Sequence, residues 1–349
     1  MKIEFLSYPL QLKHTFRIAN YARSETPCVF IKITHKNYIG FGEASLPPYL
    51  KESSESCKKY FEAVQKLPYV NHLDFESSFF ELLPIKEKLG VNPPALAALD
   101  MALYDIVGKM QNKPVWQLVG SDKNKMPITS CTLGIDSEEV LKKKIEETKD
   151  FKVLKVKLGS DNDKELIEII RRYTDKPLYV DANQGWSDKH FAVDFIHWLK
   201  TLNVLMIEQP MKKTNLEGNA YITENSPLPV IADESCQSLN DVSKLSGVFN
   251  GINIKLMKCG GLNEAIRMID MARKLKLQVM MGCMTESSCA IYAAAALAPQ
   301  CDFVDLDGPW LVSNNPFEAP ELEEGIIKLN EYAGLGLSSK PNSDIFFRI

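Results

Sequence analysis

The sequence lacks the segments that direct a chain into or across a membrane. Its first residues carry no apolar stretch of signal-peptide length, and no run approaches the roughly 18 apolar residues of a membrane span. The 41 lysines and arginines, against 45 aspartates and glutamates, form no concentrated basic patch. Nucleic acid and anionic membranes are therefore poor partners. We expect a cytoplasmic protein that acts on a small molecule.

Thiol, zinc and dinucleotide motifs are also missing. The eight cysteines include no Cys-x-x-Cys pair, and the five histidines show no metal-ligand spacing. We interpret the cysteines as reduced thiols in the core. No Gly-x-Gly-x-x-Gly follows a first strand, which argues against an open dinucleotide-binding sheet.

The 349 residues are enough for two domains, or for one α/β barrel with an attached domain. Residues 1–45 read as antiparallel strands with a loop over 14–26. The pattern over 53–120 is helical, and its last helix is expected over 93–109, with proline at its start and glycine at its end.

After about residue 125, short apolar runs alternate with amphipathic stretches. The runs begin near residues 128, 153, 178, 204, 229, 251, 278 and 302, so successive starts lie 22–27 residues apart. That spacing fits one strand, one helix and two short loops, and eight such units close into a parallel (β/α) barrel. The predicted fold class is α/β, a modified TIM-type barrel with an α+β capping domain.

Charged residues stand at the ends of the predicted barrel strands. A barrel strand is buried on both faces, so an ionisable side chain is costly unless it reaches the C-terminal mouth, where active sites of this fold lie. Six strands end in such residues, namely Lys155 with Lys157, Asp181, Glu208, Asp233 with Glu234, Lys255, and Asp305 with Asp307.

Asp181, Glu208 and Asp233 follow three consecutive strands, so their carboxylates should converge. Three carboxylates without histidine or cysteine suit a hard divalent ion, Mg²⁺ first and Mn²⁺ next, with open positions for substrate oxygens. Because side chains alternate along a strand, we take Asp233 as the ligand and expect Glu234 to face away and support the site. The alternative is a salt-bridge network with Lys157 and Lys255.

Lys157 and Lys255 belong to strands two and six, which are diametrically opposed in an eight-stranded barrel. They should flank the metal site from opposite sides. Lys155 shares the parity of Lys157, and like-charge repulsion together with the cation is expected to lower the lysine pKa towards that of a useful base. Such a pair suggests removal of a proton from one face of a carbon and delivery to the other, while the metal stabilises an enediolate.

Asp305 and Asp307 lie two apart on strand eight, across the barrel from strand four. Paired carboxylates there favour a cation at the far end of the substrate. The implied substrate is a zwitterion whose ammonium lies roughly 5–7 Å from its metal-bound carboxylate, about the reach of two residues. A dipeptide fits this description, whereas a single amino acid is too short and a dicarboxylate is repelled.

Over essentially the whole chain these residues resemble the enolase superfamily, and within it the muconate-lactonising subgroup. The matching motifs are Lys155-x-Lys157, Asp181-Ala-Asn, Glu208-Gln-Pro, Ala-Asp233-Glu-Ser, Asn-Ile-Lys255 with Gly260-Gly261, Gly42-Glu43-Ala44 and the helix from Ala98 to Gly108. Lysine bases acting with Mg²⁺ are known chemistry of this superfamily. The Asp305-x-Asp307 pair looks like the mark of its dipeptide epimerases, whose best-known members interconvert L-Ala-D-Glu and L-Ala-L-Glu from murein peptides.

The resemblance implies a role for each matching residue. Lys157 and Lys255 would be the acid/base pair with Lys155 as a helper. Asp181, Glu208 and Asp233 would hold the metal, and Asp305 and Asp307 the α-ammonium. It also implies an N-terminal capping domain over 1–120, a catalytic barrel over 121–317 and a C-terminal segment, 318–349, that returns to the capping domain.

Two capping loops, about 14–25 and 44–52, would close over the mouth. Arg17 and Arg23 are the cations available there for a glutamate side chain of the substrate. Phe16, Tyr21 and Tyr49 would instead line an apolar pocket. On strand seven, Cys283 and Met284 also reach the mouth, where we expect backbone contact with the substrate rather than a cysteine nucleophile.

Two alternative functions stay open. A cycloisomerase or an o-succinylbenzoate-synthase-like lyase of the same superfamily would use the same lysines on a substrate without an ammonium. A non-catalytic peptide-binding barrel would bind a dipeptide without exchanging its α-proton. The sequence leaves the oligomeric state open, a homo-oligomer included.

Overall fold

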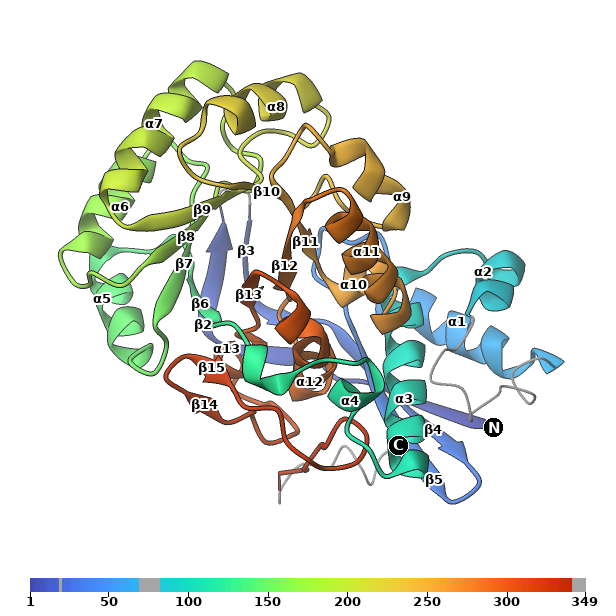
Figure 1. Cartoon of the computed structure of the whole chain (residues 1–349). Helices are drawn as coiled ribbons and strands as arrows, with labels where there is room; N and C mark the ends of the chain where they lie inside the picture. The colour runs from blue at the N-terminus through green and yellow to red at the C-terminus, as the bar shows by residue number, and fades with distance from the viewer. Residues whose placement is uncertain (19–20, 69–81, 341–349) are drawn as a thin grey trace.

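The computed structural model describes residues 1–18, 21–68 and 82–340. Eight parallel strands, β6 to β13, pair in the order of the sequence, and a parallel bridge between Thr129 and Val304 brings the two ends of the sheet together (Figure 1). The strands are β6 (Ser130–Leu133), β7 (Val153–Lys157), β8 (Leu178–Asp181), β9 (Val204–Glu208), β10 (Val230–Ala232), β11 (Gly251–Ile254), β12 (Gln278–Gly282) and β13 (Phe303–Asp305). The predicted barrel is confirmed, and each predicted strand start lies within two residues of the observed one.

Helices follow the strands and cover the outside of the barrel (Figure 1). Their apolar faces pack on the strands, as in α6, where Leu166, Ile167 and Ile170 are buried. The helices are α5 (Glu138–Glu147), α6 (Asp163–Arg171), α7 (Lys189–Thr201), α8 (Leu216–Asn225), α9 (Leu239–Val242), α10 (Leu256–Cys259), α11 (Leu262–Lys274), α12 (Ser288–Leu297) and α13 (Gly308–Leu311).

The N-terminal part forms an antiparallel sheet and a helical layer beside the barrel (Figure 1). Its elements are β1 (Lys2–Ser7), β4 (Cys28–His35), β5 (Tyr38–Ser45), α1 (Ser54–Gln65), α2 (Leu83–Leu89), α3 (Pro93–Gln111) and α4 (Val115–Leu118). Strand β5 packs closely on α3. A Cβ atom at Gly42 would lie only 1.9 Å from the carbonyl oxygen of Ala98. The glycine at this position therefore allows the contact.

Two local predictions in this part are wrong. The expected loop over 14–26 forms a hairpin of β2 (Leu10–Ile18) and β3 (Tyr21–Thr26), which pair with each other in a separate two-stranded sheet. In β2 the apolar residues Leu10, Leu12, Phe16 and Ile18 alternate with polar ones, a strand signal that the loop prediction overlooked. Helix α3 also continues past Gly108 to Gln111 and ends at Asn112, which adopts φ 50°. A Cβ atom at Gly108 would lie 2.6 Å from Gly334 Cα, so this glycine serves close packing.

The segment after the barrel runs back towards the N-terminal part. It contains the short strands β14 (Leu322–Glu323) and β15 (Ile326–Ile327). Val115 donates its backbone N–H to Gly334, and the Trp116 indole donates to the carbonyl of Asn330. We keep the domain boundaries near residues 120 and 317 as a proposal, and residues 341–349 lie outside the described part of the chain.

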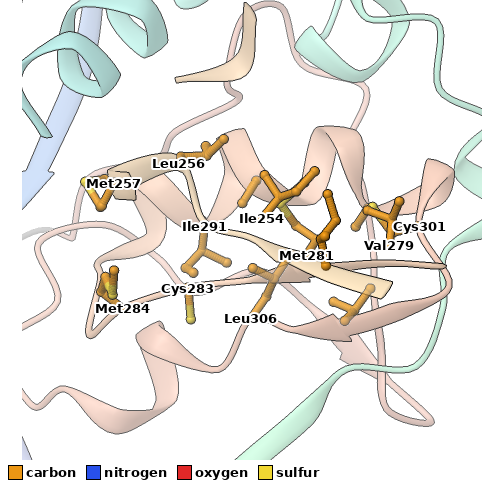
Figure 2. Close-up of a cluster of buried hydrophobic side chains, with 14 of the residues drawn as sticks. Ile254, Leu256, Met257, Val279, Met281, Cys283, Met284, Ile291, Cys301 and Leu306 are labelled. Atoms are coloured by element: carbon orange, nitrogen blue, oxygen red, sulfur yellow. The ribbon is translucent and has the colours of Figure 1, made fainter. Parts of the chain in front are cut away.

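The apolar core lies mainly between the barrel strands and their helices. Figure 2 shows part of it, where Ile254 of β11, Met281 of β12 and Ile291 of α12 belong to one cluster that also includes Cys283 and Met284. A smaller cluster, formed by Val153, Tyr179, Met206, Ile231 and Met280, fills the inside of the barrel. All eight cysteines are free and buried, which confirms the interpretation of them as core thiols.

Candidate active site

The period of two along a strand places the charged side chains inside the barrel. Val153 belongs to the internal apolar cluster, and Lys155 and Lys157 follow it at intervals of two residues. The same spacing separates Tyr179 from Asp181, and the other strands repeat it, with Met206 and Glu208, Ile231 and Asp233, and Phe303 and Asp305. The apolar layer therefore closes the barrel below, and the polar groups face its C-terminal mouth.

Asp181, Glu208 and Asp233 form the acidic centre of this mouth. Each offers a carboxylate oxygen, and these atoms all lie within 4.8 Å of one another. Among the residues that the structure describes, this is the group identified as able to hold a metal ion. All three side chains are buried. The predicted convergence of the three carboxylates is observed.

The acidic centre has the donor set that a hard divalent cation prefers. One oxygen of Glu208, Oε1, accepts a hydrogen bond of 2.8 Å from Asn253, whereas Oε2 accepts none from the described residues, although Lys155 Nζ lies 2.7 Å away. Burial, followed by the charge of Asp181, raises the pKa of Glu208 to about 7. A buried carboxylate whose Oε2 accepts no hydrogen bond and meets only the ion pair with Lys155 fits a role as a metal ligand.

Lysines surround these carboxylates. Lys157 Nζ lies 2.6 Å from Asp181 and Lys255 Nζ lies 2.7 Å from Asp233. Lys155 Nζ lies 2.7 Å from Glu208 and 3.4 Å from Asp181. The salt-bridge network weighed as an alternative is therefore present around the same residues that could hold a metal.

The expectation of a lowered lysine pKa assumes the charge of a bound cation and stays a prediction. Burial by itself lowers the pKa of Lys155, but the charges of Asp305, Glu208 and Asp181 outweigh it and raise the pKa well above its usual value. The pKa of Lys255 is likewise raised, because Asp233 outweighs burial. Close carboxylates dominate over repulsion between the ammonium groups.

Lys157 and Lys255 approach the acidic centre from opposite strands. Lys157 ends β7 and Lys255 directly follows β11, and these strands are four positions apart in the eight-stranded barrel. Lys157 pairs with Asp181 and Lys255 with Asp233, so the two amines contact different members of the acidic centre.

Asp305 and Asp307 lie at the other side of the mouth, next to β6. Asp305 accepts hydrogen bonds from Ser130 Oγ at 2.7 Å and from Lys155 Nζ at 2.8 Å. Asp307 accepts from the backbone N–H of Thr132 at 2.6 Å. Burial and the charge of Asp305 raise the pKa of Asp307 to about 6. Lys155 thus connects the Asp305 side of the mouth to the acidic centre.

The mouth opens into a cavity of about 380 Å³. Arg23, Phe16 and Tyr49 line it from the N-terminal part, while Cys283 and Met284 line it from the end of β12. Six charged residues of the predicted site also line this cavity, namely Lys155, Lys157, Lys255, Asp233, Asp305 and Asp307.

The two arginines of the hairpin differ in position. Arg23 donates to Thr285 Oγ1 at 2.7 Å and lies over the Phe16 ring inside the cavity. Arg17 pairs with Asp136 at 2.6 Å and is not among the residues that line the cavity. The side chain of Tyr21 lies outside the described part of the chain. Of the hairpin cations considered, the structure brings Arg23 to the cavity.

Some residues at the site were not predicted. Lys258 donates to Asp233 Oδ1 at 2.5 Å and to two backbone carbonyls, and the amide oxygen of Gln209 accepts from the backbone of Asp233 and Ser235. Asn253 lies two residues before Lys255, so strand alternation predicts that it faces inward as well, but we did not use this spacing. Glu234 also lines the cavity, contrary to the expectation that it faces away, because Asp233 and Glu234 both follow the end of β10, where strand alternation no longer fixes the side-chain direction.

Comparison with known families identifies the fold. Residues 2–120 match the N-terminal domain model of mandelate racemase and muconate lactonizing enzyme, and residues 138–343 match the enolase C-terminal domain-like model. The chain belongs to this family of the enolase superfamily. The resemblance inferred from the sequence motifs is confirmed.

Relatives within the family share nearly the whole chain. An L-Ala-D/L-Glu epimerase from Bacteroides thetaiotaomicron is 47% identical over 97% of this chain and 88% of its own length. A dipeptide epimerase from Enterococcus faecalis, solved with Mg and L-Leu-L-Tyr, superposes with a TM-score of 0.83 and is 31% identical, with 96% and 98% of the two chains covered. The substrate-liganded L-Ala-D/L-Glu epimerase from Bacillus subtilis gives a TM-score of 0.86 at 27% identity, with 97% and 98% covered.

Proposed function

We propose that this protein is a dipeptide epimerase that inverts the α-carbon of the C-terminal residue by 1,1-proton transfer. The observation that carries this proposal is the placement of Lys157 and Lys255 on opposite strands, each in contact with a different carboxylate of the acidic centre. One lysine faces each side of a carbon held between them. Removal of a proton on one side and delivery on the other inverts the centre.

Asp181, Glu208 and Asp233 are the residues that would hold the divalent cation, Mg²⁺ or its substitute Mn²⁺. When bound, the cation supplies positive charge to the oxygens of the substrate carboxylate. Lys157 and Lys255, each in contact with one of these carboxylates, would hold and deliver the α-proton. Lys155 adds a fixed positive charge beside Glu208.

Asp305 and Asp307 bind the α-ammonium of the dipeptide. Both line the cavity, and the raised pKa of Asp307, about 6, still leaves it ionised at neutral pH. This requirement favours a dipeptide over the substrates of a cycloisomerase or of an o-succinylbenzoate-synthase-like lyase, which carry no ammonium. Cys283 and Met284 form the adjacent wall.

The substrate we propose is L-Ala-D/L-Glu, the pair named for the relative from Bacteroides thetaiotaomicron. Arg23 is the cation placed to meet the side-chain carboxylate of the glutamate. A dipeptide of this kind arises from murein, so we propose a role in cell-wall peptide degradation. Free, buried cysteines fit a reducing cytoplasm. No helix in the described ranges is long and apolar enough to cross a membrane.

The direct test is isotope exchange. The protein is incubated with L-Ala-L-Glu and Mg²⁺ in D₂O, and deuterium at the glutamate α-carbon is followed by mass spectrometry and NMR. We expect incorporation together with formation of L-Ala-D-Glu. A broad dipeptide library without any incorporation rules out the proposal, and tight binding without exchange identifies a peptide-binding barrel instead.

A further inference from the structure

A second cavity of about 120 Å³ adjoins the active-site cavity. It lies between β6, α5, α13 and the hairpin strand β2, and its apolar lining includes Leu12, Cys131, Leu133, Phe151 and Trp310. We call this cavity the side compartment. Three residues, Phe16, Thr132 and Leu311, line both cavities and so form the wall between them.

The local fold explains why space exists here. Ser130 and Thr132 of β6 face the barrel interior, so Cys131 and Leu133 face outward by alternation. This outer face is covered by β2 and by α13, a helix of only four residues, together with the C-terminal half of α5. Short elements leave a gap that a long helix would fill.

The side compartment lies next to the carboxylate proposed to bind the substrate ammonium. Asp307 directly precedes α13, and its carboxylate accepts the backbone N–H of Thr132 at 2.6 Å. Leu311 ends the same helix. An ammonium held at Asp307 therefore places the first carbon of the N-terminal residue beside the wall residues Thr132 and Leu311.

The side compartment suits an apolar side chain in size and character. Apolar side chains supply about half of its lining, and its volume of about 120 Å³ approaches the roughly 150 Å³ of a dry apolar cavity that binds a benzene ring. Five ionisable residues also line it, namely Lys13, His14, Lys144, Glu147 and Asp150. Lys144 pairs with Asp136 at 2.6 Å, and His14 contacts Glu147 at 2.7 Å. An entering hydrocarbon group thus gains burial without breaking these two pairs.

We infer that the side compartment receives the side chain of the N-terminal residue of the dipeptide, so that the protein acts on L-Leu-L-Glu and L-Phe-L-Glu as well as on L-Ala-L-Glu. This inference rests on the proposed function, because it requires the ammonium to bind at Asp305 and Asp307. An alanine methyl stays in the main cavity. A longer apolar group passes the wall formed by Phe16, Thr132 and Leu311.

The test compares kcat/KM for L-Ala-L-Glu, L-Leu-L-Glu and L-Phe-L-Glu. We expect the value for L-Leu-L-Glu to equal or exceed that for L-Ala-L-Glu in the unmodified protein. Cys131→Phe fills the side compartment and should lower the ratio of the leucine to the alanine substrate about tenfold or more. Cys131→Ala is the matched control, which leaves the space open and keeps the ratio.

Leu311→Ala provides a second variant that does not depend on overfilling the core. It makes an opening in the wall, and it should raise the ratio of kcat/KM for L-Phe-L-Glu to that for L-Ala-L-Glu severalfold. Exchange of L-Ala-L-Glu alone, or ratios unaffected by both Cys131→Phe and Leu311→Ala, overturns the inference and leaves the proposed function standing. Absence of exchange with every dipeptide overturns both.

Discussion

Lys155 and Asp305 form a buried hydrogen bond of 2.8 Å that spans the two halves of the active site. Asp305 belongs to the proposed ammonium site, whereas the same lysine nitrogen lies 2.7 Å from Glu208 in the acidic centre. A change at Asp305 therefore disturbs both halves. Asp307 has no such link through an ion pair among the described residues, which makes it the cleaner probe of ammonium binding.

Asp307→Asn should weaken dipeptide binding with little effect on proton transfer. The variant keeps the size of the side chain and removes the charge that faces the ammonium. Loss of a charge-assisted hydrogen bond corresponds to roughly 1.5–3 kcal/mol, so KM should rise about 10- to 100-fold while kcat changes little. Steady-state kinetics with L-Ala-L-Glu measure this split. An unchanged KM would place the ammonium elsewhere and reopen the cycloisomerase alternative.

Chelation of divalent metal should abolish activity without unfolding the protein. The acidic centre is compensated by Lys155, Lys157, Lys255 and Lys258, so it stays paired when no cation is bound. We expect EDTA to stop isotope exchange while the circular dichroism spectrum stays the same, and Mg²⁺ to restore exchange.

Glu208→Gln serves as the ligand variant of that experiment. Calorimetric titration with Mg²⁺ should show binding to the unmodified protein and at least tenfold weaker binding to the variant. Full exchange activity in the presence of excess EDTA contradicts the assigned metal role.

Arg23 and Arg17 provide a matched pair for the specificity of the substrate side chain. Arg23 lines the cavity, whereas Arg17 pairs with Asp136 away from it. Arg23→Met should lower kcat/KM for L-Ala-L-Glu about tenfold or more relative to L-Ala-L-Gln, because a carboxylate loses its cation. Arg17→Met should leave that ratio unchanged. Equal effects of the two substitutions speak against Arg23 as the glutamate contact.

The pH dependence of stability should reflect Asp100, which is buried on α3. Its carboxylate accepts from the backbone and side chain of Asn263, yet burial raises its pKa to about 7, against 3.8 for an ordinary aspartate. Between these values the folded state holds a proton that the unfolded state releases. The contribution of Asp100 is therefore complete below pH 3.8 and is lost as pH rises towards 7.

Denaturant unfolding of the unmodified protein and of Asp100→Asn between pH 4 and 8 measures this effect. The variant should be less stable near pH 4, because one acceptor oxygen is lost, and this difference should shrink as pH rises. Its free energy of unfolding should fall less steeply with rising pH, by at most about 1.4 kcal/mol per pH unit. Parallel curves for the two proteins would mean that Asp100 is ionised throughout this range.

The sequence predicted the barrel and its inward-facing charges because both depend on simple periods. A repeat of 22–27 residues defined the strands, and a period of two carried Lys157, Asp181 and Asp305 to one face of each strand. Alternation no longer applies beyond the strand ends, and although Asp233 and Lys255 were still placed correctly there, other residues were missed. Glu234 is one such case. Lys258 is another, because its contact with Asp233 depends on the short helix α10 rather than on a strand.

Surface elements of the N-terminal part were predicted less well. The apolar alternation in β2 was overlooked, and the hairpin β2–β3 is also stabilised by distant contacts, such as the bridge between Leu12 and Val312. The partner of Arg17 likewise comes from 119 residues further along the chain. Which of its two arginines reaches the cavity could be decided only from coordinates.

The most direct test of the two-lysine account is stereospecific exchange in D₂O by Lys157→Ala and Lys255→Ala. Each variant retains one amine, so each should exchange the α-proton of only one of L-Ala-L-Glu and L-Ala-D-Glu, with opposite preferences, while interconversion of the two falls by at least about a hundredfold. Exchange of both epimers by either variant, or the same preference in both, would contradict the placement of the lysines on opposite faces of the substrate.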